Sequence, residues 1–154
     1  MKLIEFLKEN FIIPDLISSD KKGVLIELAE FLEEKKAIKS RATLFDSLME
    51  RENLGSTGIG ENVAIPHAKS EDADNIITLF GRSLKGIDFD SLDQKPVHFI
   101  CLLIAPSNST GLHLKALARI SRLFKSQSLR EEILIAKNIN EIYSILIKED
   151  SEFS

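Results

Sequence analysis

Three histidines, at positions 67, 98 and 113, are the side chains best suited to chemistry near neutral pH. An imidazole with an unperturbed pKa of about 6.5 is mostly neutral at pH 7. Its unprotonated nitrogen is then a competent nucleophile toward phosphorus. Histidine phosphorylation is therefore the chemistry that this sequence favours, and the surroundings of each ring indicate which one is the acceptor.

His67 has the surroundings of a functional residue. Pro66 restricts the backbone before it, the small Ala68 follows it, and a glycine-rich segment, Gly55 to Gly60, precedes it closely. Such a loop can bring bare backbone near a ligand, and its N–H groups can form a nest for an anion. The loop residues expected to bind a phosphoryl group held by His67 are Ser56, Thr57, Gly58 and Gly60.

Two further side chains are candidates for the same site. Arg51 offers a guanidinium fork that can bind a phosphoryl group through two hydrogen bonds. His113 shares a predicted helix face with Leu117 and Ile120, so its ring points inward from the first turn. It is either a core histidine bonded to a backbone carbonyl or a second imidazole beside His67, and the residues leave both interpretations open.

The remaining histidine fits a structural role. His98 lies inside an apolar segment, on the face opposite Phe99 and Cys101, without polar neighbours in sequence. Cys101 is the single cysteine, which excludes an internal disulfide and a zinc site built mainly from thiolates.

Several familiar sites are disfavoured. Gly55 and Gly60 have the spacing of a P-loop, but Glu61 and Asn62 stand where lysine and serine or threonine are required. Val63 stands where a dinucleotide-binding fingerprint requires glycine or alanine. There is no HExxH or GxSxG motif, so a metal site would have to combine distant histidines, and no metal or cofactor is expected.

Composition limits the class of protein. The chain has 154 residues, of which 44% are hydrophobic and 29% charged, and this is typical of one globular domain over residues 1–154. Its net charge of −4 disfavours nucleic acid as a partner. Its apolar runs are too short to span a bilayer and its first residues lack a signal-peptide core, so we expect no membrane insertion and a cytoplasmic location.

Hydrophobic periodicity predicts helices flanking a strand-rich middle, that is, a single-domain α/β sandwich with a mixed sheet. Expected helix starts are Ser19, Ser40, residues 107–110, Ser128 with Glu131, and Asn138 with Glu141. Expected extended segments are residues 11–13, Val63–Pro66 with His67 at its end, Asn75–Arg82 and the central Pro96–Ile104. Residues 55–60 are expected to form a loop, and residues 149–154 to fray.

The stretch RENLGSTGIGENVAIPHA, residues 51–68, resembles the active-site signature of phosphotransferase-system (PTS) enzyme IIA domains of the fructose/mannitol type, including their nitrogen-regulatory branch. The resemblance continues through residues 94–97, 102–106 and 112–114, and it covers nearly the whole chain. It implies one EIIA type 2 domain over residues 1–154, with a mixed sheet flanked by helices.

The same resemblance implies a set of roles. His67 would accept a phosphoryl group from an HPr-like phosphocarrier protein, His113 would be the second active-site imidazole, and Arg51 would lie near the phosphorylated ring. The group would then pass to a IIB domain, or would act as a signal on a regulatory target protein. Of these two uses, the isolated domain and its GSTGIG loop favour the regulatory one.

Two functions from other classes remain open. A metallohydrolase would use His67 and His113 as metal ligands and would retain zinc or manganese on purification. An interaction module without chemistry would take no phosphate from phosphoenolpyruvate, enzyme I and carrier.

Overall fold

The most apolar strand of the chain lies at the centre of the sheet. In this computed structural model, which describes residues 1–152, β6 (Val97–Pro106) pairs antiparallel with β5 (Ile77–Ile87) along one side. Along its other side it pairs in parallel with β3 (Val63–Ala64) and β4 (His67–Ser70). The prediction of a central strand that is covered on both faces is confirmed.

The sheet has six strands in the order β1-β5-β6-β3-β2, with β4 also pairing with β6. The two outer strands are β1 (Ile12–Ile13) and β2 (Gly58–Gly60). The α-helices are α1 (Lys21–Glu34), α2 (Arg41–Asn53), α3 (Thr110–Leu123), α4 (Gln127–Ile135) and α5 (Ile139–Ser151). Two 3-10 turns, η1 (Leu3–Glu5) and η2 (Glu9–Phe11), precede β1.

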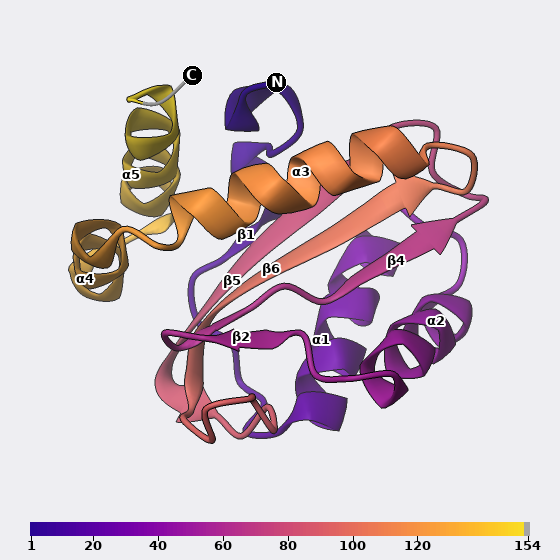
Figure 1. Cartoon of the computed structure of the whole chain (residues 1–154), viewed down its shortest axis with the longest axis horizontal. Coiled ribbons are helices and arrows are strands. Elements are labelled where there is room, and N and C mark those ends of the chain that lie inside the picture. The colour runs from indigo at the N-terminus through magenta and orange to yellow at the C-terminus, as the bar shows by residue number, and fades with distance from the viewer. Residues whose placement is uncertain (153–154) are drawn as a thin grey trace.

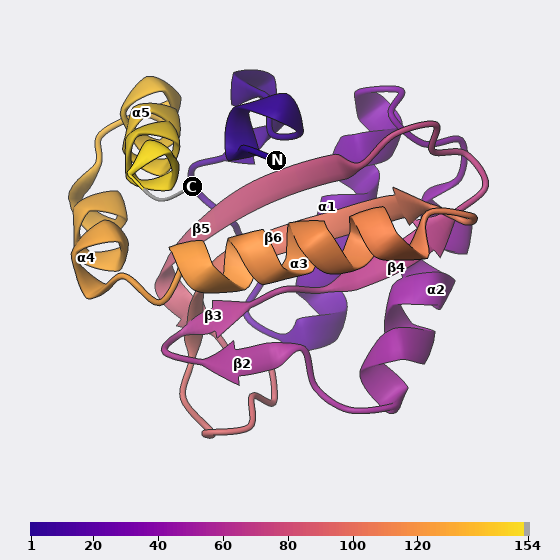
Figure 2. The same ribbon diagram turned by 45° about the horizontal axis from the view of Figure 1, so that its top comes forward.

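The helices form layers on both faces of the sheet, as the α/β sandwich prediction requires. Helix α3 covers one face and α1 and α2 cover the other, while α4 and α5 pack beside the N-terminal turns at one end (Figures 1 and 2). Odd-numbered residues 99–105 of β6 join the core under α3, and even-numbered residues 100–104 join the core under α1 and α2. No helix within residues 1–152 is both long and apolar enough to cross a membrane.

Two helices begin one or two residues away from the cap predicted from the sequence. Helix α1 is capped by Asp20 rather than Ser19, and the Asp20 carboxylate accepts the N–H of Gly23 at 2.7 Å. Helix α4 is capped by Ser126 rather than Ser128, and Ser126 Oγ both accepts the N–H of Leu129 and donates to Glu149 of α5. Both serines fit a capping pattern, so the contact with α5 decides between them. The caps predicted at Ser40 and Asn138 are confirmed.

The segment around Pro66 differs from the prediction. His67 opens β4 instead of following the end of a strand, because Pro66 has no N–H and divides one extended edge into β3 and β4. The Pro66 carbonyl accepts the N–H of Leu103 at 3.0 Å, which keeps both parts in register with β6. Residues 58–60, predicted as loop, form β2 because they pair with β3.

The C-terminal residues were expected to fray, but α5 continues to Ser151. Asp150 is buried, and its carboxylate accepts the backbone N–H of Leu3 at 2.8 Å and Nε–H of Arg119 at 2.7 Å. These contacts join the N-terminal turn, α3 and α5. Residues 153–154 of the predicted tail lie outside the described residues.

We expect Asp150→Asn to lower the free energy of unfolding by about 3 kcal/mol, because it removes the buried carboxylate that pairs with the part-buried guanidinium of Arg119. Urea denaturation followed by circular dichroism measures the change. The exposed Asp46→Asn in α2 is the matched control and should alter stability by less than about 0.5 kcal/mol. Equal stability of the two variants would contradict the structural importance of the Asp150 cluster.

Candidate functional site

His67 is held by its own backbone segment. The ring is half-buried, and its Nδ1 lies 2.9 Å from the carbonyl oxygen of Ile65. A carbonyl can only accept, so Nδ1 carries the proton and donates this hydrogen bond. The other ring nitrogen, Nε2, is therefore unprotonated in the neutral ring and carries the lone pair that a nucleophile requires.

Arg51 approaches that lone pair from the last turn of α2, a helix that packs beside β4. Its Nε–H donates to Nε2 of His67 at 3.2 Å, and its Nη1–H donates to the carbonyl oxygen of Gly55 at 2.9 Å. The guanidinium is thus fixed at both ends, with a positive charge directly at the unprotonated nitrogen.

His113 reaches the same place from the first turn of α3, on the opposite face of the sheet. Its ring centroid lies 5.3 Å from that of His67, and the two rings are nearly perpendicular, at 78°. The side chain is buried, and its Nε2 has no hydrogen-bond partner within the described residues. The structure therefore places His67, Arg51 and His113 together. Of the two interpretations of His113, its position agrees with a second imidazole beside His67.

Burial disfavours the protonated form of both rings. Burial is the main cause that lowers the pKa of His67; the Ile65 carbonyl opposes this effect and the Arg51 charge adds to it. Burial also lowers the pKa of His113, with smaller contributions in the same direction from His67 and Lys69. At pH 7 the lone pair of His67 is accordingly available.

The glycine-rich loop lies next to these rings, but several of its donors are already used. Thr57 is buried, and both its N–H and its hydroxyl donate to the carboxylate of Glu52. The N–H of Gly58 donates to Ser56 Oγ at 3.1 Å. Phosphate binding by Ser56, Thr57, Gly58 and Gly60 therefore stays a prediction, and in this conformation Thr57 stabilises the loop.

Two neighbouring residues were missed from sequence. Glu52 continues the stripe of Leu44 and Leu48 at intervals of four, and a charged residue on a buried helix stripe was the available signal. Lys69 follows His67 on the same face of β4, and its Nζ donates to Thr110 Oγ1 at 2.8 Å at the start of α3. The Lys69 charge thereby lies beside His113.

The other reactive side chains lie apart from this site. Nδ1 of His98 pairs with the carbonyl oxygen of Ser83 at 2.7 Å, which agrees with its structural interpretation. Cys101 is fully buried, and burial raises the pKa of its thiol to about 12, so it is a poor nucleophile.

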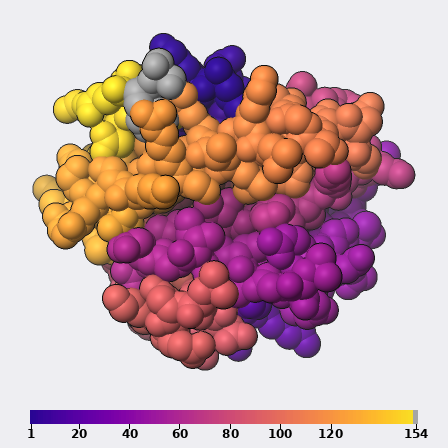
Figure 3. Space-filling view, viewed as in Figure 1, coloured from indigo at the N-terminus to yellow at the C-terminus, as the bar shows by residue number. Residues whose placement is uncertain are grey.

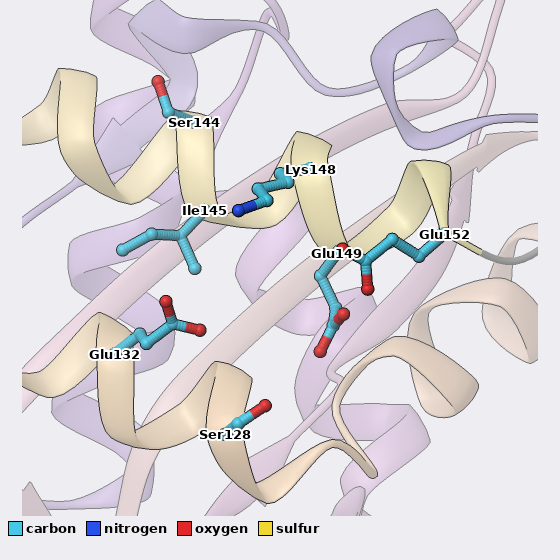
Figure 4. A pocket seen from close by; sticks show the side chains of 7 residues that line it. All are labelled: Ser128, Glu132, Ser144, Ile145, Lys148, Glu149 and Glu152. Atoms are coloured by element: carbon cyan, nitrogen blue, oxygen red, sulfur yellow. The ribbon is translucent and has the colours of Figure 1, made fainter.

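A separate hollow of about 340 Å³ lies between α4 and α5 (Figure 4). None of the residues that line it is a histidine. Its lining residues are Ser128, Glu132, Ser144, Ile145, Lys148, Glu149 and Glu152. We assign it no role in the site around His67.

The geometry does not fit the metallohydrolase alternative. A metal bound by His67 would need the Nε2 lone pair, and the guanidinium of Arg51 stands against that atom. Within residues 1–152, no group of three His, Cys, Asp or Glu side chains could hold a metal ion. A neutral imidazole with an unprotonated Nε2, beside a guanidinium and a second imidazole, can attack a phosphoryl group and hold it temporarily.

The chain matches the family described as "Phosphoenolpyruvate-dependent sugar phosphotransferase system, EIIA 2" over residues 5–149. A nitrogen regulatory protein of Bradyrhizobium diazoefficiens is 39% identical over 95% of each chain. The fructose-specific EIIABC component of Bacillus subtilis is 34% identical over 97% of this chain, which spans only 24% of that longer protein.

Among solved structures, the nitrogen regulatory protein IIA-Ntr of Neisseria meningitidis superimposes with a TM-score of 0.85 at 35% identity. The alignment covers 92% of this chain and 97% of that one. Sequence and fold agree over nearly the whole length, and the chain therefore belongs to the EIIA type 2 family of the phosphoenolpyruvate-dependent phosphotransferase system.

Proposed function

We propose that this chain is a phosphohistidine phosphotransfer protein, a single EIIA type 2 domain that accepts a phosphoryl group on Nε2 of His67. The donor would be an HPr-like phosphocarrier protein. The observation that supports the proposal best is that each nitrogen of the His67 ring has a different hydrogen-bond partner. Nδ1 keeps its proton against the Ile65 carbonyl, while the Nε2 lone pair faces the Arg51 guanidinium.

The transfer balances without any further reactant. The Nε2 lone pair forms the new P–N bond as the P–N bond to the carrier's histidine breaks. The carrier's ring, protonated on its other nitrogen, takes back the electron pair of the broken bond and leaves as a neutral imidazole. The Nδ1 proton remains on His67. Catalysis of such a step depends on positioning and on fixed charges around the phosphoryl oxygens.

The neighbours of His67 supply those charges and donors in the proposal. The Arg51 guanidinium can exchange its contact with Nε2 for contacts with oxygens of the attached phosphoryl group. Nε2 of His113, which has no partner among residues 1–152, can form a hydrogen bond with the same group.

A protein donor agrees with the surface around the site. Leu54 follows the helix end that bears Arg51 and is 83% exposed, and Leu114 follows His113 and is 62% exposed. Exposed apolar side chains beside a polar site are typical of protein contacts. In the space-filling view, α3 and the β2–β4 segment lie side by side on the same face of the molecule (Figure 3). An HPr-like partner also implies the cytoplasmic location expected from the sequence.

The downstream use is proposed to be regulatory. The Bradyrhizobium and Neisseria relatives are named nitrogen regulatory proteins, and each matches this chain over nearly its full length. Addition of a doubly charged phosphoryl group to His67 would change the surface that a target protein contacts. The alternative is relay to a fructose/mannitol-type IIB domain, which the fructose-specific EIIABC relative favours.

We expect the wild-type chain to incorporate one acid-labile, base-stable phosphate when incubated with labelled phosphoenolpyruvate, enzyme I and an HPr-like carrier. His67→Ala should incorporate none, because it removes the acceptor nitrogen. His98→Ala is the matched control and should be labelled as the wild type is. Full labelling of His67→Ala would refute the assignment of the acceptor.

We also expect His67 to titrate below its ordinary pKa of about 6.5. Burial penalises the imidazolium, so protonation requires a lower pH and the neutral form of the acceptor predominates at pH 6.5. Because the unfolded chain binds this proton first, the His67 contribution to stability falls as pH drops from about 6.5 toward the folded pKa. Titration of the ring ¹⁵N shifts measures the midpoint, and a value above 6.5 would contradict the electrostatic account of the site.

The regulatory and transport alternatives differ in the fate of the phosphoryl group. We expect labelled protein to retain its phosphate when mixed with purified fructose-type and mannitol-type IIB domains. The two proteins are separated rapidly after mixing, and the amount of labelled phosphate on the IIB domain is measured. Fast and complete passage to one of these domains would replace the regulatory role with transport.

A further inference from the structure

A buried carboxylate, that of Glu52, anchors the loop beside the proposed acceptor. The Glu52 side chain is only 2% exposed, and Lys21 Nζ of α1 lies 3.0 Å from its Oε1. Oε1 also accepts the backbone N–H of Thr57 at 3.1 Å, and Oε2 accepts the Thr57 hydroxyl. Burial of a charge is costly unless it is paired and hydrogen-bonded, and here both oxygens are engaged.

Glu52 is connected to His67 by three hydrogen-bond steps, of which the contact between Glu52 and Thr57 is the first. Thr57, which Glu52 holds, accepts the N–H of Ile65 on its own carbonyl at 3.0 Å. The carbonyl of Ile65 in turn accepts Nδ1–H of His67 at 2.9 Å. The Ile65 carbonyl oxygen, which fixes the tautomer of His67, therefore belongs to a segment that is hydrogen-bonded to Thr57 and, through Thr57, anchored on Glu52.

Glu52 is connected to Arg51 by the other end of the loop. The Glu52 backbone carbonyl accepts the N–H of Gly55 at 3.0 Å. The Gly55 carbonyl then accepts Nη1–H of Arg51 at 2.9 Å. Movement of the loop would thus disturb both the guanidinium and the ring that the proposed reaction uses.

We infer that Glu52, paired with Lys21, is a positioning residue for phosphoryl transfer: it holds residues 54–57 so that Arg51 and Nε2 of His67 face the incoming group. This inference rests on the proposed function. Glu52 does not touch the reacting atoms, and its effect passes through Thr57 and the loop backbone.

The charge of Glu52 matters as well as its shape. Glutamine has nearly the same size, but it has one acceptor oxygen where Glu52 offers two, and its amide would direct donors at Thr57 or Lys21. The Glu52 charge also raises the pKa of His67, against the larger effect of burial and the effect of Arg51. Glu52→Gln therefore removes the charge and one acceptor oxygen of this side chain without creating a cavity.

The test is single-turnover transfer from phosphorylated HPr-like carrier to wild type, Glu52→Gln and Glu50→Gln, at several carrier concentrations. Glu50 lies on the exposed face of the same helix and is the matched control. We expect Glu52→Gln to lower the maximal transfer rate about 10- to 100-fold, as loss of alignment does. The half-saturating carrier concentration and the final extent of labelling should stay at the wild-type values.

A second readout separates positioning from loss of folding. The ¹⁵N spectrum of folded Glu52→Gln should show that His67 no longer populates a single Nδ1–H tautomer. Thr57→Val, which removes only the hydroxyl contact, should show a smaller change in the same direction. These changes should appear while circular dichroism and the denaturation midpoint report a folded population.

The inference is overturned if folded Glu52→Gln transfers at the wild-type maximal rate with an unchanged tautomer. It is also overturned if the maximal transfer rate of Glu52→Gln falls only in proportion to its unfolded fraction, or if Glu50→Gln lowers that rate by the same factor. A wild-type protein that takes no label removes the proposed function, and this inference with it. A labelled wild type with an unimpaired variant removes this inference alone.

Discussion

One hydrogen bond governs the chemistry open to this site, the bond from Nδ1–H of His67 to the Ile65 carbonyl. It fixes the tautomer and so leaves the lone pair on Nε2, the nitrogen that faces Arg51. With the opposite tautomer, Nε2 would carry the proton and two donors would face each other. Burial of both imidazoles reinforces this arrangement, because it disfavours the protonated rings.

The fold brings the three side chains together at one edge of β6. The break at Pro66 starts β4 at His67, in register with Leu103 of the central strand. Helix α2 supplies Arg51 from one layer, and α3 supplies His113 from the other (Figure 1). The two apolar cores that position these helices therefore also determine the distances within the site.

Much of this could be predicted from sequence where a local signal decides the structure. The continuous apolar run of β6 and the caps at Ser40 and Asn138 each indicate their structure directly. Ser126, Asp150 and Glu52 could not be placed in this way, because their roles depend on partners distant in sequence or across a loop, namely Glu149, Leu3 and Lys21. The tautomer of His67 likewise depends on backbone geometry that spacing does not reveal.

The central claim is that Nε2 of His67 is the atom that holds phosphorus. The most direct test is ¹⁵N and ³¹P NMR of the phosphorylated protein, prepared with ¹⁵N-labelled histidine. The account predicts phosphorus coupled to Nε2 of His67, with Nδ1 still protonated. Phosphorus on Nδ1, on His113 or on any other residue would contradict it.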